Sequence, residues 1–278
     1  MTVVRDKALQ IIEPPGGWGS LRMSDLWRGR ELLAFLTWRD IKVRYTQAFL
    51  GVLWAVLQPV LMMVVFTLFF GRVARLPSDG LPYAVFALSG LVPWTFFANA
   101  VGSSTESLLA DKNLVSKVYF PRLIIPLASL LSWLPDLLIG TLILLALSVL
   151  YGVAPAVTVL VVPLLAVLAA VVAASVSVWL SALNVAYRDV RFAVRFLLQL
   201  WLFATPVIYP ASFVPAAWRW VLGLNPMTGL TETFRWAVFG RTAAPLGLLV
   251  LSVAVSTVVL AAGVVYFRRV EANFADVI

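Results

Sequence analysis

Long apolar stretches, separated by short polar segments, make up most of the chain. A helix of about 20 apolar residues crosses the roughly 30 Å of hydrocarbon in a bilayer. Six stretches meet that length, and the fifth is the shortest. We therefore predict an all-α membrane protein with six transmembrane helices, at Ala48–Phe70, Tyr83–Leu109, Ile124–Tyr151, Val157–Val185, Phe192–Tyr209 and Leu246–Phe267.

The segment Pro210–Gly240 has a different pattern. Its two apolar stretches, Ala216–Leu224 and Met227–Phe239, are too short to cross a bilayer, and prolines and glycines interrupt them. Stretches of this length are typical of re-entrant or interfacial segments. We predict a re-entrant helical hairpin that enters from the outer face; an aromatic-rich interfacial loop is the alternative. Its aromatic side chains, candidates for an outer gate, include Phe213, Trp218, Trp220, Phe234 and Trp236.

A helix is also predicted before the first span, at Glu31–Tyr45. On a wheel of 100° per residue it has two apolar arcs, with charged residues in the gaps between them. One arc carries Trp38 and Ile41, and the other carries Leu32 and Leu36. Two apolar faces suit an interfacial helix that lies on the membrane with a second protein packed below it. An ordinary interfacial anchor is the alternative.

Composition supports a membrane protein and excludes several chemistries. Of the 278 residues, 62% are hydrophobic and 12% are charged, whereas soluble domains average about 25% charged residues. The chain has no cysteine and no histidine. Disulfides, thiol nucleophiles, Ser-His triads and metal sites with His or Cys ligands are therefore excluded, and no metal site is expected. The net charge of +8 is better explained by membrane orientation than by binding to nucleic acid.

The distribution of Lys and Arg predicts how the chain is oriented. Sixteen of these residues fall in the two terminal segments and alternate loops, and five fall on the opposite side. The positive-inside rule then places both termini in the cytoplasm and agrees with an even number of spans. We expect a cytoplasmic tail at residues 1–30, a transmembrane domain at 31–278 with its spans within 48–267, and a cytoplasmic tail at 268–278.

Ionisable residues within the spans are few, namely Glu106, Asp136 and Arg195. Asp136 would lie roughly 18 Å along a continuous third helix. A single deep acid supports a proton pathway poorly, so pairing with a neighbouring helix, or exposure to a watery cavity, is the preferred interpretation. None of the four lysines is followed by Ser or Thr, as the phosphate-binding loop G-x-x-x-x-G-K-[ST] requires. If ATP drives this protein, a separate subunit hydrolyses it.

Two polar stripes and several aromatic side chains are candidates for a transport pathway. Asn99, Ser103 and Glu106 share one face of the second span, and Ser129, Ser132 and Asp136 share one face of the third. Such stripes line a conduit or form interhelical hydrogen bonds, with the second slightly favoured for each stripe alone. Aromatic candidates for stacking on sugar rings are Trp54, Phe66 and Phe70 on the first span and Trp201, Phe203 and Tyr209 on the fifth.

Six segments, taken in order, resemble the transmembrane subunit of ABC-2 type exporters. They are ELLAFLTWRDIKVRYTQAFLGVLWAVLQPVL, KNLVSKVYFPRLIIP, LNVAYRDV, ATPVIYP, NPMTGL and FRRVEANFADVI. Within that family the chain is most similar to permeases for O-antigen, capsule and teichoic-acid polymers. The resemblance covers residues 31–278, and it rests on the order and spacing of the segments.

The resemblance implies a homodimer in the cytoplasmic (inner) membrane, joined by two ATPase subunits that carry ATP and Mg, with no cofactor in this chain. Its cargo would be a lipid-linked polysaccharide. Spans one and five would line the conduit, and Pro210–Gly240 would form an outer gate. The loop Asp111–Arg122 would dock into the ATPase, with Asp111 capping a short helix that Pro121 stops. The coupling residues would be Asp111, Lys112, Asn113, Lys117, Tyr119, Phe120 and Arg122, with Arg39 and Arg44 of the N-terminal helix.

Three other functions compete with polymer export. An ABC-2 exporter of small amphiphiles or drugs would share the fold and differ only in cargo. A membrane glycosyltransferase usually needs clustered carboxylates, whereas the acids here lie on separate segments without a DxD pattern. An ion-coupled carrier would transport along a proton or sodium gradient without ATP.

Overall fold

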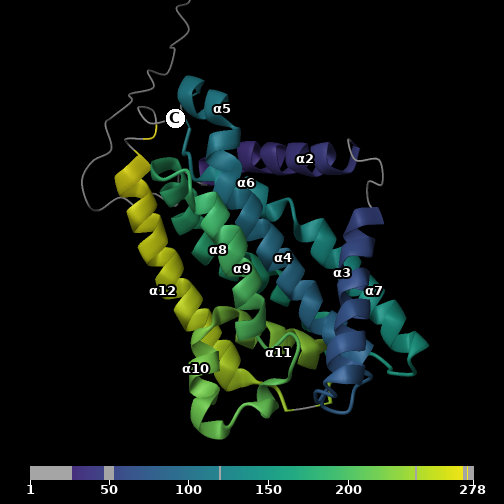
Figure 1. The fold of residues 1–278 in the computed structure, drawn as a ribbon. Helices are drawn as coiled ribbons and strands as arrows, with labels where there is room; N and C mark the ends of the chain where they lie inside the picture. Colours follow the sequence, from purple (N-terminus) through teal and green to yellow (C-terminus); the bar gives the residue numbers. More distant parts are fainter. Residues whose placement is uncertain (1–26, 47–52, 119, 242, 272–273, 275–278) are drawn as a thin grey trace, which may run out of the picture.

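The computed structural model describes residues 27–46, 53–118, 120–241, 243–271 and 274. All regular elements in this part of the chain are helices. Most long helices run side by side in a bundle, and α2 (Arg30–Thr46) lies across one end of it (Figure 1). The short helix α5 (Lys112–Lys117) lies at that same end, and α10 (Arg219–Leu224) lies at the opposite end. We call these the α5 end and the α10 end.

Five helical segments are long and apolar enough to cross a membrane. They are α3 (Leu53–Phe66) with the π-helical turn η1 (Thr67–Val73), α4 (Tyr83–Ala110), α6 (Ile124–Leu131) with α7 (Leu134–Leu150), the 3₁₀ turn η2 (Val157–Val161) with α8 (Val162–Ala186), and α12 (Leu246–Glu271). The chain is therefore a multi-pass membrane protein, as its composition predicts.

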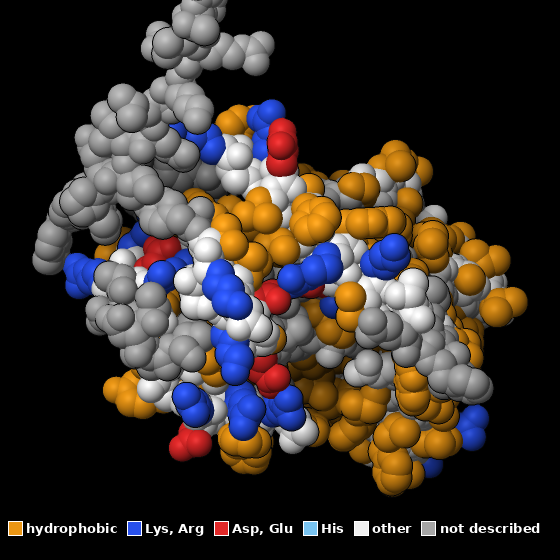
Figure 2. All heavy atoms as spheres, turned by 90° about the horizontal axis from the view of Figure 1, so that it is seen from above, with side chains coloured by type: hydrophobic (Ala, Val, Ile, Leu, Met, Phe, Trp, Pro, Cys, Tyr) orange, Lys and Arg blue, Asp and Glu red, His pale blue; other side chains and the backbone are white. Residues whose placement is uncertain are grey.

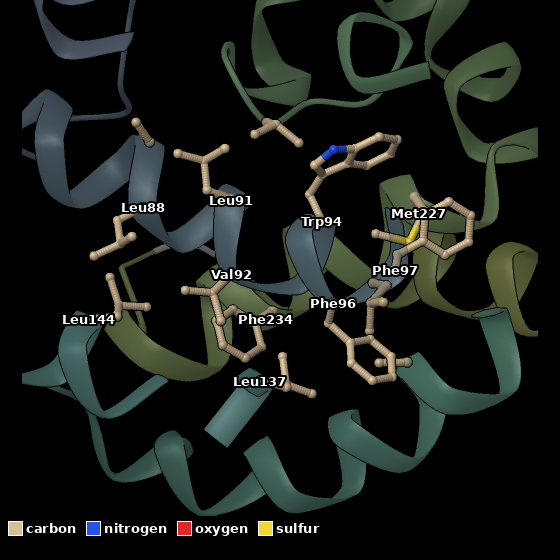
Figure 3. Packing of buried hydrophobic residues seen from close by; sticks show 14 of the residues in the cluster. Leu88, Leu91, Val92, Trp94, Phe96, Phe97, Leu137, Leu144, Met227 and Phe234 are labelled. Atoms are coloured by element: carbon tan, nitrogen blue, oxygen red, sulfur yellow. The ribbon is translucent and has the colours of Figure 1, made fainter. Parts of the chain in front are cut away.

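Helix α4 forms the centre of the bundle. Its most apolar stretch is 83% buried, whereas the corresponding stretches of the other four segments are 17–28% buried. Leu91, Val92 and Phe97 of α4 lie in a core completed by Leu137 and Leu144 of α7 and by Met227 and Phe234 of α11 (Pro226–Phe239; Figure 3). The run Ala84–Trp94 of α4 is buried on every side, as expected for a stretch that is mostly apolar all round.

The third predicted span is interrupted. Helix α6 ends at Leu131, and α7 begins at Leu134, with Pro135 in its first turn. Proline has no amide hydrogen to donate to the preceding turn and crowds its carbonyl, which accounts for the break. The prediction of one continuous helix at Ile124–Tyr151 was wrong in this respect. It followed the hydropathy of the stretch and took no account of Pro135.

The fifth predicted span also differs. Helix α9 covers only Val190–Ala204, so it is too short to count among the five apolar segments above. Thr205 precedes Pro206 and has an extended backbone, with ψ at 141°. The residue before a proline is disfavoured in helical conformation, and the helix accordingly ends there. Residues 205–210 continue as non-helical chain.

The segment after α9 contains two short helices close to their predicted positions. A 3₁₀ turn η3 (Ala211–Phe213) comes first, then η4 (Ala216–Trp218) with α10, and then α11. Helix α11 is buried against α4, α8 and α12. Phe213, Trp218 and Trp220 are exposed. The aromatic side chains of this segment are therefore divided between the surface and the core.

A second group of buried apolar residues lies at the α5 end, and we call it the α5-end cluster. It joins α2, α4, α5, α6, α8 and α12. Its members include Leu36, Leu108, Val115, Ile124, Val185, Phe267 and Phe274. The helices that meet at this end are thus packed into one unit.

Candidate functional site

The short helix α5 projects from the α5 end of the bundle (Figure 1). Val115 is 3% exposed and packs into the α5-end cluster, so one side of the helix is anchored. Lys112, Asn113 and Lys117 are exposed. Figure 2, which looks onto this end of the molecule, shows many Lys and Arg side chains there. The helix thus presents polar and basic groups outward from a fixed apolar base.

An ion pair connects α5 to α2. The guanidinium of Arg39 donates two hydrogen bonds to the carboxylate of Asp111, at 2.6 and 3.2 Å, and it also binds Asp40. The hydrogen bonds to Asp111 raise the pKa of Arg39 above its ordinary value, so the guanidinium stays charged. Two parallel bonds of this kind fix orientation as well as distance. Helices α2 and α5 are therefore held in one relative position.

The predicted side-chain cap by Asp111 was wrong. Asp111 does occupy the position before α5, but its side chain makes no capping hydrogen bond. The carboxylate is bound by Arg39 instead, and a charged partner competes effectively with a backbone amide for it. The helix ends at Lys117, before Pro121, and Val118 has an extended backbone.

The far end of the same loop is fixed to α12. The backbone amide of Arg122 donates to Glu271 Oε1 at 2.9 Å, and the Arg122 guanidinium donates to the Glu271 carbonyl. Phe120 is half-buried against the α5-end cluster. Arg122 and Phe120 therefore hold the loop to the bundle, and their predicted contact with an ATPase stays a prediction. Tyr119 lies outside the described residues.

Arg44, the second basic coupling candidate on α2, is bound within the chain. It donates to Ser132 Oγ at 2.7 Å, to the Ser132 carbonyl at 3.0 Å and to Asp136 Oδ2 at 3.1 Å. Its guanidinium also lies 3.4 Å from the centroid of the Trp133 ring. Burial lowers the pKa of Arg44. The guanidinium thus fills the break between α6 and α7, where helical hydrogen bonding is interrupted.

Pairing of Asp136 with a neighbouring helix, the preferred interpretation of this acid, is confirmed by its ion pair with Arg44. The depth calculated along one continuous helix does not apply, because Asp136 lies in the first turn of α7, after the break. Here α2, which lies across the bundle, reaches the acid through a long arginine side chain.

Replacing Asp136 by leucine is expected to lower the free energy of unfolding by about 1–2 kcal/mol, because Arg44 then stays half-buried without its carboxylate. The control is Glu106→Gln, which removes a 2.7 Å pair with Arg195 in which the arginine is 66% exposed. Exposed pairs contribute little, so its effect should stay below about 0.5 kcal/mol. The free energy of unfolding of each purified variant is measured in detergent. Equal effects would contradict the difference between the two pairs.

The polar stripes form contacts between helices at several positions. Ser103 accepts a hydrogen bond from Trp133 Nε1 at 2.7 Å, and Glu106 pairs with Arg195 of α9. Asn99 lies at a small cavity of about 20 Å³ together with Gln58 and other residues of α3, α4 and α7. Interhelical hydrogen bonding thus accounts for Ser103, as it does for Ser132 and Asp136. Lining of a conduit by Asn99 and Glu106 stays a prediction.

The aromatic candidates on α3, η1 and α9, and Tyr209 in the chain after α9, occupy different environments. Trp54 and Phe203 are exposed, whereas Phe66 is buried and contacts Phe70 edge-on at 5.5 Å. Trp201 is half-buried and lies 5.2 Å from Phe97, centroid to centroid. Tyr209 is half-buried as well. An apolar cavity of about 380 Å³ lies between α8 and α9, and Trp201 is part of its lining.

Sequence reasoning missed the role of several residues in this arrangement. Asn225 caps α11 by accepting from the Met227 amide at 3.0 Å, and it also accepts from Trp201 Nε1 at 3.0 Å. The Asn-Pro pair at the start of α11 is a recognisable helix-start signal. Glu232 and Arg235 form a buried ion pair on α11, and their spacing of three within an apolar stretch could have indicated it.

Comparison with known proteins identifies the family of this chain. The sequence profile described as "ABC-2 type transporter" matches residues 31–239. An O-antigen export system permease protein, RfbA, of Myxococcus xanthus is 32% identical over 254 residues, which cover 91% of this chain and 97% of the relative. An RfbA protein of Klebsiella pneumoniae is 28% identical over 251 residues, covering 89% and 95%. The chain, a transport permease and not an enzyme, therefore belongs to the ABC-2 type transporter family.

Proposed function

We propose that this chain is the transmembrane subunit of an ATP-driven exporter that moves a lipid-linked polysaccharide of the O-antigen class out of the cytoplasm. As an ABC-2 permease, it works with an ATP-binding partner subunit. The observation that carries the proposal is end-to-end similarity to permeases named for O-antigen export, which extends over 91% of this chain. Teichoic-acid and capsule polymers belong to the same chemical class of cargo.

The partner ATPase would dock on the α5 end. Support comes from α5 itself, which exposes Lys112 and Lys117 while Val115 is buried beneath them. The helix is bound to α2 by the Arg39–Asp111 pair, and its loop is bound to α12 by Arg122 and Glu271. A force on α5 is therefore passed to several helices together. A flexible loop would absorb the same movement.

In the proposed topology the chain crosses the inner membrane six times, and both termini lie in the cytoplasm. The α8 helix ends at Ala186 and α9 begins at Val190, while the segment after α9 continues to α10 at the other end of the bundle (Figure 1). At 1.5 Å per residue the 15 residues of α9 cover about 22 Å, so the following non-helical residues would complete the fifth crossing. Buried α11 supports a re-entrant hairpin, since backbone at membrane depth must be enclosed by protein or face a watery cavity.

A homodimer would enclose the pathway. Large apolar side chains are exposed on α3, η1 and α9, among them Trp54, Phe69, Phe196 and Phe203. In a dimer, these helices of each copy would face a shared passage, as predicted for spans one and five. Aromatic rings can stack on sugar rings without binding a hydrated polymer tightly.

Purification of the chain together with its ATPase, followed by native mass spectrometry, tests this proposal. We expect two copies of this chain, two ATPase subunits and a bound lipid-linked glycan. ATP hydrolysis should rise when that glycan is added to the complex in nanodiscs. Stimulation by small amphiphiles and not by the glycan would contradict the polymer assignment and favour the drug-exporter alternative.

A further inference from the structure

Helix α11 carries a pair of charges inside the apolar bundle. Arg235 is 5% exposed, and its Nη1 lies 2.9 Å from Glu232 Oε1, three residues earlier on the same helix. The guanidinium also donates to Ser89 Oγ of α4 at 3.2 Å, and it lies 3.9 Å from the centroid of the Phe86 ring. Contacts from two helices thus surround a group that is costly to bury without partners.

The same pair binds the chain that follows α9, which we call the outlet segment (residues 205–211). Arg235 Nη2 donates to the Pro206 carbonyl at 3.1 Å, and Glu232 Oε1 accepts from the Ala211 amide at 3.0 Å. One ion pair therefore holds the outlet segment near both of its ends. Tyr83 of α4 adds a third bond between these two, from its hydroxyl to the Ile208 carbonyl at 2.7 Å.

A glycine on α4 makes room for this contact. A Cβ atom added to Gly90 would lie 2.9 Å from Val207 Cα, 3.0 Å from the Val207 carbonyl oxygen and 3.2 Å from Arg235 Nη2. Distances below 3.0 Å are essentially never seen for a real Cβ atom. The absence of a side chain at position 90 thus lets the outlet segment lie directly on α4, beside the guanidinium.

Stability alone is a weak reason for burying an ion pair, since well-packed apolar residues often serve as well or better. The contact between this ion pair and the outlet segment can break without leaving either charge unpaired. Glu232 and Arg235 belong to one helix, so they stay paired if the outlet segment leaves α11. Departure then breaks hydrogen bonds to uncharged backbone groups and leaves neither charge alone. The contact is specific when formed and can be released at moderate cost.

We propose that Glu232 and Arg235 are positioning residues that clamp the outlet segment onto α4 and α11, and so set the path of the chain beyond α9 during export. The part of this inference that concerns export rests on the proposed function, whereas the clamp itself rests on the contacts above. Release of the clamp would let residues 206–211 move away from α4 and α11, while Asn225 still donates to the Ala204 carbonyl at 3.3 Å and to Thr205 Oγ1 at 2.9 Å at the end of α9.

The test uses the absence of cysteine from the chain, which allows a single reporter thiol. Ile208→Cys places the thiol in the buried outlet segment, and its maleimide labelling rate is measured on the purified complex in nanodiscs. Glu232→Leu with Arg235→Met removes both charges without leaving one unpaired. We expect labelling to become about tenfold faster in that variant. Tyr83→Phe, which removes only one bond, should accelerate it about threefold.

Two controls separate release of the clamp from unfolding. Leu144→Cys reports on the core at α7, and its labelling should stay slow in the Glu232→Leu, Arg235→Met background. Arg219→Met removes an arginine of α10 that donates to the carbonyls of residues 212 and 214, and it should leave labelling of Ile208→Cys unchanged. An unchanged rate for Ile208→Cys in the double variant would overturn the clamp. Faster labelling of Leu144→Cys as well would overturn it too, because the effect would then be general.

The amount of glycan exported per ATP hydrolysed distinguishes a positioning role in export from a merely structural role. In proteoliposomes, the double variant should keep its ATP hydrolysis and export several-fold less glycan per ATP. A normal yield per ATP would contradict positioning in export. If the unmodified complex exports no glycan at all, the proposal that a glycan is the cargo is contradicted. The labelling result still decides whether the clamp exists.

Discussion

Replacing Val115 by aspartate is expected to reduce ATP-driven export at least tenfold while the partner's own ATP hydrolysis persists. Val115 is the buried residue of α5, and a carboxylate in its place would have to leave the α5-end cluster for water. The cost of keeping an unpaired charge buried is several kcal/mol, so α5 would detach from its base. A docked ATPase would then move a loose helix and not the bundle.

The matched control is Ser116→Asp, which introduces the same charge one residue later at an exposed position. It should keep most of the export activity, since no buried contact is lost. Export and ATP hydrolysis are measured side by side in proteoliposomes that contain the complex. Comparable loss in both variants would mean that charge near α5, and not its anchoring, controls coupling.

Replacing Gly229 by alanine is expected to prevent folding or to lower the free energy of unfolding by about 2–3 kcal/mol. A Cβ atom at this position would lie 2.3 Å from both the Leu248 carbonyl oxygen and Ser252 Oγ. The first of these is backbone of α12 and cannot move without shifting the helix. The Gly229 amide also donates to Ser252 Oγ at 3.0 Å, so displacement would weaken that bond.

Gly247→Ala on α12 is the control, because no atom lies within 4 Å of a Cβ built there. Alanine favours a helix over glycine by up to about 1 kcal/mol, so this variant should be neutral or slightly stabilising. Thermal unfolding followed by size-exclusion chromatography in detergent distinguishes the two. A Gly229→Ala protein as stable as the Gly247→Ala protein would show that α11 and α12 are not packed as described.

Short-range signals predicted the short helices well. The expected stretch Ala216–Leu224 coincides with η4 and α10, and Met227–Phe239 differs from α11 by one residue. Proline and glycine mark these boundaries locally, so no tertiary information is needed. The breaks near Pro135 and Pro206 carried the same signal. They were missed because a long hydropathic stretch was given more weight than the proline within it.

The short helix expected in the loop Asp111–Arg122 is confirmed as α5, but the contacts of this loop could not be predicted from the sequence. Asp111 was expected to cap α5 from its neighbouring position, whereas it pairs with Arg39, 72 residues away. Arg122 likewise binds Glu271, 149 residues away. A helical wheel shows which residues share a face of one helix, and it carries no information about the partner on another helix. Long-range contacts of this kind therefore required the structure.

We propose that this chain is one half of a passage without an ATPase of its own, moved by a separate ATPase through the α5 end. Movement of a fluorescent lipid-linked glycan across proteoliposome membranes tests it most directly. The account predicts movement when this chain, its ATPase and ATP are all present, and none when any one is left out. Movement by the chain alone, or along a proton gradient without ATP, would contradict it.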